Sequence, residues 1–308
     1  MVNDFFMEQT LATYKNYLLK EKKYSLHTTI AYVNDVASFF DFYKEDDLSV
    51  VDIDLKHIDY SAIRAWVSFL SSEGMVNKTI NRKISSLKSF FKYLYVSKQV
   101  DEYLFVVHKS LKNEKTIQVP FSEKEIEALH LESFSENFEG KRDRLILELL
   151  YSLGIRRAEL IGLKMCDVDF GNNTLKVTGK RNKQRIVPMV DTVVELIKQY
   201  LVVRNERYGD VKDVLILTNN GNILNETFVY RLINNYFRGV TSKAKKSPHM
   251  LRHTFATHML NNGADLNSIK ELLGHSSLAS TQIYVHSSLS ELKNVYKNAH
   301  PRFRKDGE

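Results

Sequence analysis

The chain has 308 residues, 43% of them hydrophobic, and a formal net charge of +7. This length predicts two ordinary domains, each with enough apolar residues for a packed core. Cys166 is the single cysteine, which excludes a disulfide framework and a thiolate metal cluster. The acidic, amphipathic N-terminus is unlike a signal peptide, and no apolar run approaches the roughly 20 residues that span a bilayer. We therefore expect a soluble, cytoplasmic protein that does not engage a membrane.

The positive charge is unevenly placed along the chain. Residues 1–120 hold 16 Lys and Arg against 15 Asp and Glu, whereas residues 121–308 hold 28 against 22. No acidic residue lies between positions 176 and 185, where five basic residues gather: Lys176, Lys180, Arg181, Lys183 and Arg185. Such a cluster suits a polyanion such as nucleic acid, although a solvated basic turn has the same composition.

The first hundred residues predict a small all-helical domain. Apolar residues at helical spacing predict four helices, over residues 4–20, 25–40, 60–70 and 77–94. Ser25 and Asn77 stand where caps of the second and fourth helices belong. Residues 108–120 are polar and aperiodic, and they predict an extended linker that ends at Pro120. We therefore place the first domain at residues 1–107, the linker at 108–120 and the second domain at 121–308.

The second domain predicts helices that flank one pair of strands. A helix starts at Ser122, and a strongly apolar helix over residues 143–153 stops at Gly154. Residues 174–188 change to the pattern of a strand, a basic turn and a second strand. Helices return from Thr192, and residues 247–286 predict three short ones. The predicted fold is thus mainly α with a small antiparallel β-sheet, with an α+β second domain.

Several residues of the second domain could act on a phosphodiester. Arg156 follows the apolar helix, His249 and Arg252 are three apart and share one helical face, His275 follows a helix end, and Tyr284 comes nine residues later. Taken singly, each has a plainer interpretation: a salt-bridge partner, a packed histidine, or one of 16 tyrosines. The combination in this order is much less probable by chance.

These residues carry a family resemblance. The segments LGIRRAELIGL, VTGKRNKQRIVPM, SPHMLRHTFATHML and LLGHSSLASTQIYVH resemble the catalytic domain of the tyrosine recombinases, or phage-integrase-like enzymes, and the tail ELKNVYKNAHPR resembles the Xer recombinases. The resemblance extends over the whole chain and implies a SAM-like, core-binding first domain. Two departures stand out. Residues 101–104 replace the family's Asn-Pro pair, and Arg157, to which we assign no role, replaces a smaller residue.

The resemblance implies the groups that bind and attack the phosphate. Arg156 and Arg252 match the two arginines whose guanidinium forks hold the non-bridging oxygens. Tyr284 matches the nucleophile, a phenol whose attack a cationic pocket assists. The implied reaction is a transesterification through a 3′-phosphotyrosyl link and a free 5′-hydroxyl. It conserves bond energy, so we expect no cofactor and no metal.

The remaining matched residues move protons or support the site. Lys180 matches the general acid that protonates the leaving 5′-oxygen, with Arg181 and Lys183 as its nearest rivals. His249 matches a residue that bonds the phosphate and helps to deprotonate the tyrosine, and His275 matches a donor to a non-bridging oxygen. Glu159 matches a supporting acid, which we expect to bond a histidine.

The resemblance also implies how the chain holds DNA. The two domains would close on double-stranded DNA with a specific core site as a C-shaped clamp. Candidate DNA contacts are Lys83, Lys88, Lys92, Arg181, Lys183 and Arg185. They could equally be solvated side chains.

The resemblance further implies an assembly of four protomers. A tetramer of identical or paralogous chains would form by cyclic exchange of the C-terminal helix. We expect its apolar Leu289, Leu292, Val295 and Tyr296 to dock on the neighbour rather than on their own domain. A septal DNA translocase is a possible activating partner.

Other functions remain open at this point. Residues 264–284 also fit the helix-turn-helix of a non-catalytic DNA-binding regulator, and a type IB topoisomerase uses the same tyrosine and arginine chemistry. A metal site of His249, His253 and His258 is disfavoured, because their spacing does not bring all three to one face. Within the recombinases, resolution of chromosome dimers and integration or excision of a mobile element are both possible.

Overall fold

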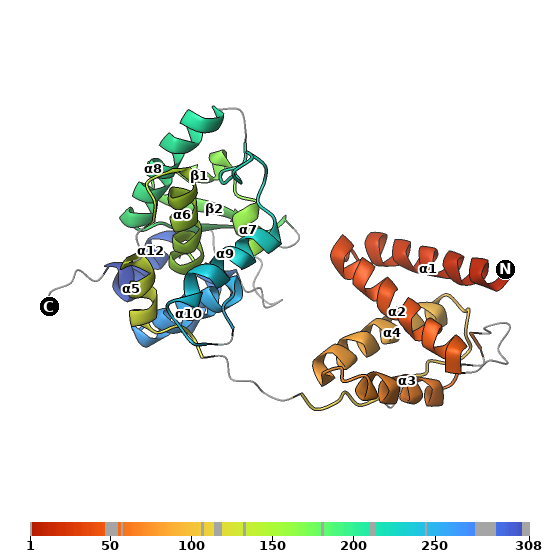
Figure 1. Ribbon diagram of the computed structural model, residues 1–308. Coiled ribbons are helices and arrows are strands. Elements are labelled where there is room, and N and C mark those ends of the chain that lie inside the picture. The colour runs from red at the N-terminus through yellow and green to blue at the C-terminus, as the bar shows by residue number, and fades with distance from the viewer. Residues whose placement is uncertain are drawn as a thin grey trace. The chain divides into compact units, whose positions relative to one another are not determined.

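The computed structural model describes residues 2–46, 55–56, 58–105, 108–113, 119–131, 134–179, 182–209, 213–243, 245–274 and 288–303. The chain divides into two compact units, Met1–Thr116 and Ile117–Glu308 (Figure 1). Among the described residues, no helix combines the length and the apolarity that crossing a membrane requires.

Helices build the described part of the first unit: α1 (Val2–Lys20), α2 (Leu26–Asp46), α3 (Tyr60–Ser72) and α4 (Asn77–Val96). Their apolar faces meet in an aromatic core, where Phe39 and Trp66 pack edge to face with ring centroids 5.3 Å apart. Ser25 caps α2 as predicted, because its Oγ accepts from the Thr28 amide. The predicted cap at Asn77 is wrong, since Asn77 is already the first helical residue of α4.

Part of the predicted linker is docked on the first unit. The side-chain amide of Asn81 on α4 pairs with both backbone groups of Leu111, donating to its carbonyl and accepting from its N–H at 2.9 Å each. Tyr60 on α3 shares a 2.7 Å hydrogen bond with His108. Residues 108–113 therefore lie against α3 and α4, and the buried core of the second unit begins at Phe121.

The second unit surrounds one central helix, α6 (Phe138–Ser152), which packs against α8, α9 and α10 (Figure 1). The helices around it are α5 (Glu123–Leu131), α7 (Arg157–Ile161), α8 (Asp191–Tyr208), α9 (Glu226–Arg238), α10 (Pro248–Asn261), α11 (Leu266–Leu273) and α12 (Ser288–Ala299), with 3-10 turns at Met165–Asp167 and Pro301–Phe303. Because α6 is covered on several sides, its apolar run continues around the helix instead of forming one stripe.

A three-stranded antiparallel sheet completes the second unit, in the order β1 (Val168–Asp169), β2 (Thr174–Thr178), β3 (Gln184–Pro188). The predicted pair of strands is confirmed: Leu175 lies opposite Val187, and both side chains are fully buried. The Gly179 amide donates to the Lys183 carbonyl at 2.7 Å at the base of the turn. The sequence did not predict β1, because two residues are too short for an alternating pattern to show.

The C-terminal helix α12 packs on its own unit. The Tyr296 hydroxyl is buried and donates to the Ser152 carbonyl on α6 at 2.6 Å. Arg302, just beyond α12, bonds both oxygens of the buried Glu148 at 3.2 Å. Val295 packs against the same core, so in the single chain both residues lie on their own unit, and the predicted docking of this helix on a neighbour stays a prediction. The side chains of Leu289 and Leu292 lie outside the description.

Candidate active site

Gly154, just after the end of α6, allows the turn that leads to Arg156. Gly154 has a φ of +56°, and a Cβ there would lie 2.4 Å from Cδ1 of Phe255, so both backbone conformation and space require glycine. The chain then turns, and Arg156 becomes the N-cap of α7. Glu159, three residues on, accepts from the Arg156 amide at 2.8 Å, as the third residue of a capping box does.

The carboxylate of Glu159 is the centre of a cluster of arginines. Arg156 Nη1 lies 2.6 Å from Glu159 Oε1. Arg185, on β3, approaches with a bidentate fork, Nη1 to Oε1 at 3.0 Å and Nη2 to Oε2 at 2.9 Å. Arg252 Nη1 lies 4.0 Å from Oε2. Three cations around one anion leave a local excess of positive charge, which favours a phosphate.

Arg252 is held by backbone carbonyls from two other segments. Its Nη1 donates to the Gly154 carbonyl and its Nη2 to the Leu273 carbonyl, at 2.7 Å each. Burial, followed by the charge of Arg156, lowers the pKa of Arg252 to about 10. The side chain therefore remains a cation at neutral pH. Its side chain is 7% exposed, whereas that of Arg156 is 39% exposed, so the two arginines line the site at different depths.

Glu159 stays ionised despite its burial. Burial alone raises the pKa of this carboxyl, but the hydrogen bonds from Arg185 and from the Arg156 amide outweigh it, and the pKa is lowered overall. The expectation of a histidine partner is not met within the described ranges, where the side chains that bond this carboxylate are arginines. Arg185 on β3 and Arg156 are the described side chains that bond it.

The sequence missed the place of Arg185 in this cluster, because it was grouped with the basic turn. Strand alternation was the signal that could have found it. Arg185 pairs with Val177 and lies two residues before Val187, and both valines are fully buried. A strand presents every second side chain on the same face, so Arg185 faces inward as they do.

Other predicted residues are divided between the surface and the segments outside the description. His249 is exposed in the first turn of α10, which Ser247 caps by accepting from the Met250 amide. Lys183 is exposed beside the turn. Lys180, Arg181, His275 and Tyr284, together with the third of the predicted short helices, lie outside the described residues.

The three lysines predicted on α4 differ in exposure. Lys83 is only 12% exposed, because its Nζ lies 3.4 Å from the buried Asp35 carboxylate and above the Trp66 ring. Lys88 is half-buried, and Lys92 is exposed. Lys92 is thus the most accessible of the three predicted DNA contacts.

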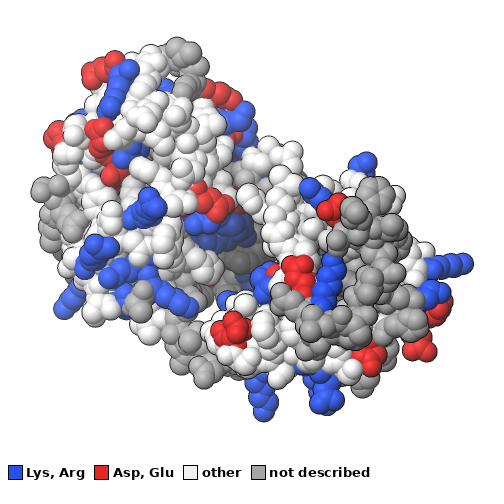
Figure 2. All heavy atoms as spheres, turned by 45° about the vertical axis from the view of Figure 1, so that its right-hand side comes forward, with Lys and Arg blue, Asp and Glu red and all other residues white. Residues whose placement is uncertain are grey.

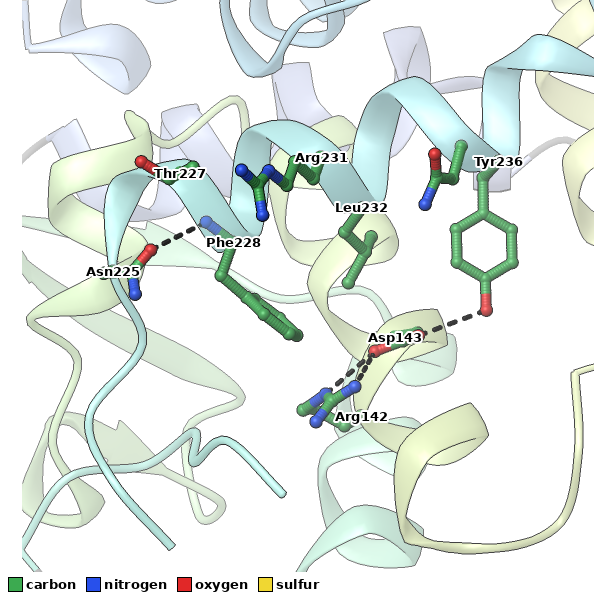
Figure 3. A pocket seen from close by; sticks show the side chains of 9 residues that line it. Arg142, Asp143, Asn225, Thr227, Phe228, Arg231, Leu232 and Tyr236 are labelled. Atoms are coloured by element: carbon green, nitrogen blue, oxygen red, sulfur yellow. Dashed lines mark hydrogen bonds and ion pairs between the residues drawn. The ribbon is translucent and has the colours of Figure 1, made fainter. Parts of the chain in front are cut away.

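A separate hollow of about 500 Å³ lies between α6 and α9 (Figure 3). Arg142 and Asp143 lie at its floor, and they bond each other through two arginine nitrogens at 2.8 and 2.7 Å. Burial raises the pKa of Asp143, which also accepts from the Tyr236 hydroxyl. Of the predicted catalytic residues that the structure describes, none lines this hollow, so we place the chemistry at the arginine cluster and not here.

The proposed metal alternative is weakened by the contacts of His258. Its Nδ1 shares a hydrogen bond with the Tyr151 hydroxyl at 3.1 Å, and its Nε2 lies 2.9 Å from the Phe121 carbonyl. Both ring nitrogens are therefore engaged by the fold. Figure 2 shows Lys and Arg side chains gathered over the lower part of the larger unit, while acidic side chains lie above them and at the centre of this face. Clustered positive charge favours binding of a polyanion.

The structure thus places a partly exposed and a buried arginine beside the base of a basic hairpin, and comparisons with known proteins show the family of the chain. Residues 120–291 match the phage integrase family, and residues 11–98 match the phage integrase N-terminal SAM-like domain. Tyrosine recombinase XerC of Staphylococcus carnosus is 38% identical over 293 residues, covering 94% of this chain and 97% of the relative. XerC of Staphylococcus haemolyticus is 35% identical over 304 residues, covering 98% and 100%.

Solved structures agree with this assignment. The pre-cleavage complex of XerH site-specific recombinase bound to difH substrate has a TM-score of 0.66 at 25% identity, covering 92% of this chain and 83% of that one. A lambda integrase dimer bound to a core site has a TM-score of 0.68 at 17% identity, covering 98% of each chain, which shows likeness of fold. The chain therefore belongs to the phage integrase family, as a tyrosine-type site-specific DNA recombinase of the Xer kind.

Proposed function

We propose that this recombinase resolves chromosome dimers by exchanging strands between two copies of a specific core site. The observation that carries the proposal is the arginine cluster, in which Arg156 and Arg252 are held at different depths beside one carboxylate. Similarity to XerC proteins over nearly the whole chain favours the chromosomal role over integration or excision of a mobile element.

The two arginines bind the scissile phosphate. Each guanidinium can donate to one non-bridging oxygen, and together they stabilise the negative charge that grows on the pentacoordinate phosphorus. The Glu159 carboxylate offsets part of the repulsion between them in the absence of DNA. This charge stabilisation requires no metal. Because the phosphotyrosyl link preserves the energy of the broken phosphodiester bond, the reaction requires no nucleotide cofactor.

Tyr284 is the proposed nucleophile. Its Oη forms a bond to phosphorus while the bond from phosphorus to the 5′-oxygen breaks, which leaves a 3′-phosphotyrosyl link. His249 takes part in removing the phenol proton, Lys180 gives a proton to the leaving 5′-oxygen, and His275 donates to a non-bridging oxygen. The 5′-hydroxyl of another strand then attacks the phosphotyrosyl link and reverses the step.

The proposed assembly contains four protomers and two duplexes. The two units close around each duplex as a C-shaped clamp, and lysines such as Lys92 and Lys183 bind backbone phosphates. Cyclic exchange of the C-terminal helix would first release Tyr296 from the Ser152 carbonyl of its own unit. The protomers are identical or include a paralogous recombinase, a septal DNA translocase activates them, and the protein acts in the cytoplasm.

A plasmid assay tests this function against its alternatives. The substrate carries two directly repeated candidate core sites, and a matched plasmid carries none. Excision of the segment between the sites supports the proposal, whereas relaxation of the plasmid without sites indicates a type IB topoisomerase. Tight binding without any strand exchange, even with paralogues added, indicates a regulator. Arg252→Lys should reduce excision at least about 100-fold, since lysine cannot reproduce the guanidinium fork.

A further inference from the structure

Arg185 directs its three side-chain nitrogens into the protein. The two Nη atoms bond the two oxygens of Glu159, and Nε donates to the Leu272 carbonyl at 2.7 Å. The side chain is 13% exposed, against 39% for Arg156, whose Nη2 makes only a 3.3 Å contact with the Gly274 carbonyl. Arg185 is therefore placed to organise protein groups, whereas Arg156 is placed to meet a substrate.

These three bonds join parts of the chain that carry different proposed catalytic groups. Arg185 lies on β3, one residue after Gln184, which pairs with Thr178 at the base of the hairpin that contains Lys180. Glu159 belongs to α7 and bonds Arg156. Leu272 is near the end of α11, three residues before His275.

Two glycines allow this close approach. Gly274 has a φ of +65°, and a Cβ on it would lie 3.1 Å from Cδ of Arg185. A Cβ on Gly179, at the other side of the hairpin base, would lie 3.1 Å from Glu159 Oε1. The hairpin base, α7 and the end of α11 thus meet at the Arg185–Glu159 pair, where the packing leaves little space for a side chain on either glycine.

We propose that Arg185 is a positioning residue for strand cleavage, which fixes the hairpin of Lys180, the loop of Arg156 and the segment that leads to His275 in one frame without binding DNA itself. The inference rests on the proposed function of those three residues. Its physical basis is the planar guanidinium, which donates in three fixed directions at once. A lysine at this position would keep the positive charge, but its single ammonium group could not bond all three acceptors in these directions.

The test measures cleavage and DNA binding separately. Full-length wild type, Arg185→Lys and Arg185→Met are compared on a nicked duplex carrying the core site, with single-turnover adduct formation giving the cleavage rate and fluorescence anisotropy giving the affinity at several salt concentrations. Arg185→Lys should cleave roughly 10-fold more slowly and Arg185→Met roughly 100-fold more slowly, because small displacements of reacting groups have effects of this size. Affinity and its salt dependence should stay unchanged. Lys183→Met, on the same hairpin, should weaken binding and reduce the salt slope by about one.

A pH profile adds a result that loss of fold would not produce. Without Arg185, Glu159 loses the bond that most strongly opposes the effect of burial on its pKa, so the pKa rises. The cleavage rate of Arg185→Met should then fall as the pH is lowered through a range where the wild type is unaffected. Cooperative thermal unfolding of both variants confirms that they are folded, and Arg185→Lys alone decides the matter if Arg185→Met does not fold.

Each outcome bears on a different claim. Wild-type cleavage rates in both Arg185 variants would overturn the positioning role while leaving the recombinase function intact. Weaker binding with a reduced salt slope and an unchanged cleavage rate would make Arg185 a phosphate contact and overturn the inference as well. If the wild type itself forms no adduct, the proposed function fails, and the role of Arg185 fails with it.

Discussion

The ion pair between Glu148 and Arg302 offers a quantitative test of how the C-terminal segment docks. Glu148 on α6 is fully buried, and the side chain of Arg302 is 21% exposed. Two bonds of 3.2 Å join them, and Glu148 also accepts from Ser152 Oγ. Hydrogen bonds to charged groups contribute about 1.5–3 kcal/mol. Because Glu148 keeps its other partners when Arg302 is lost, we expect a coupling energy near the lower end, about 2 kcal/mol.

A double-mutant cycle measures this coupling. Glu148→Gln, Arg302→Met and the double variant are unfolded with denaturant, and the transition of the second unit is followed. Arg302→Met alone should lower its Tm by roughly 4–8 °C, and adding Glu148→Gln should restore part of the loss. Docking within one chain predicts the same coupling over about a 50-fold range of protein concentration, whereas docking on a neighbour predicts a coupling that grows with concentration. A coupling below about 0.5 kcal/mol would refute the reasoning altogether.

Three further predictions concern stability and the linker. Burial lowers the pKa of His300 to about 3 and also lowers that of His258. On acidification the unfolded chain therefore takes up protons before the folded one, so the free energy of unfolding should fall from about pH 6.5 downward, and less steeply in His300→Phe. Equal pH slopes in the wild type and in His300→Phe would count against this cause. Gly154→Ala should lower the free energy of unfolding by at least about 3 kcal/mol. Gly74 also has a positive φ, but a Cβ there would meet nothing within 4 Å, so Gly74→Ala should cost only about 1 kcal/mol. Equal losses for the two variants in chemical denaturation would mean that backbone conformation alone decides the cost. Asn81→Ala should speed hydrogen exchange of the Leu111 amide at least about 10-fold, while the control Ser85→Ala, one turn along α4, should leave it unchanged. Unchanged exchange of this amide in Asn81→Ala would show that Asn81 does not hold the linker.

Sequence reasoning performed best where local pattern decides structure. Helical spacing predicted α2, α3 and α4, and the change to alternation predicted β2 and β3. Motif resemblance selected Arg156 and Arg252, and the structure brings both to one carboxylate although 96 positions separate them in the sequence.

Sequence patterns could not place the long charged side chains or the C-terminal segment. Lys83, a candidate DNA contact, lies against Asp35 and Trp66, because the apolar stem of a lysine can be buried while its amine pairs with a carboxylate. Composition could not show that Arg185 joins the site, since a basic cluster looks the same whether its members point outward or inward. The docking of α12 depends on Glu148 and Ser152, which lie more than 140 residues away in the chain. No local pattern contains that information.

The most direct test of the proposed mechanism is the covalent intermediate itself. Wild type and Tyr284→Phe are incubated with a nicked duplex carrying candidate core sites, and a denaturant-stable protein–DNA adduct is sought. We expect an adduct with the wild type and none with Tyr284→Phe, while both bind the site with similar affinity. An adduct that persists in Tyr284→Phe would contradict the assigned nucleophile, and tight binding by the wild type without any adduct would contradict the catalytic mechanism.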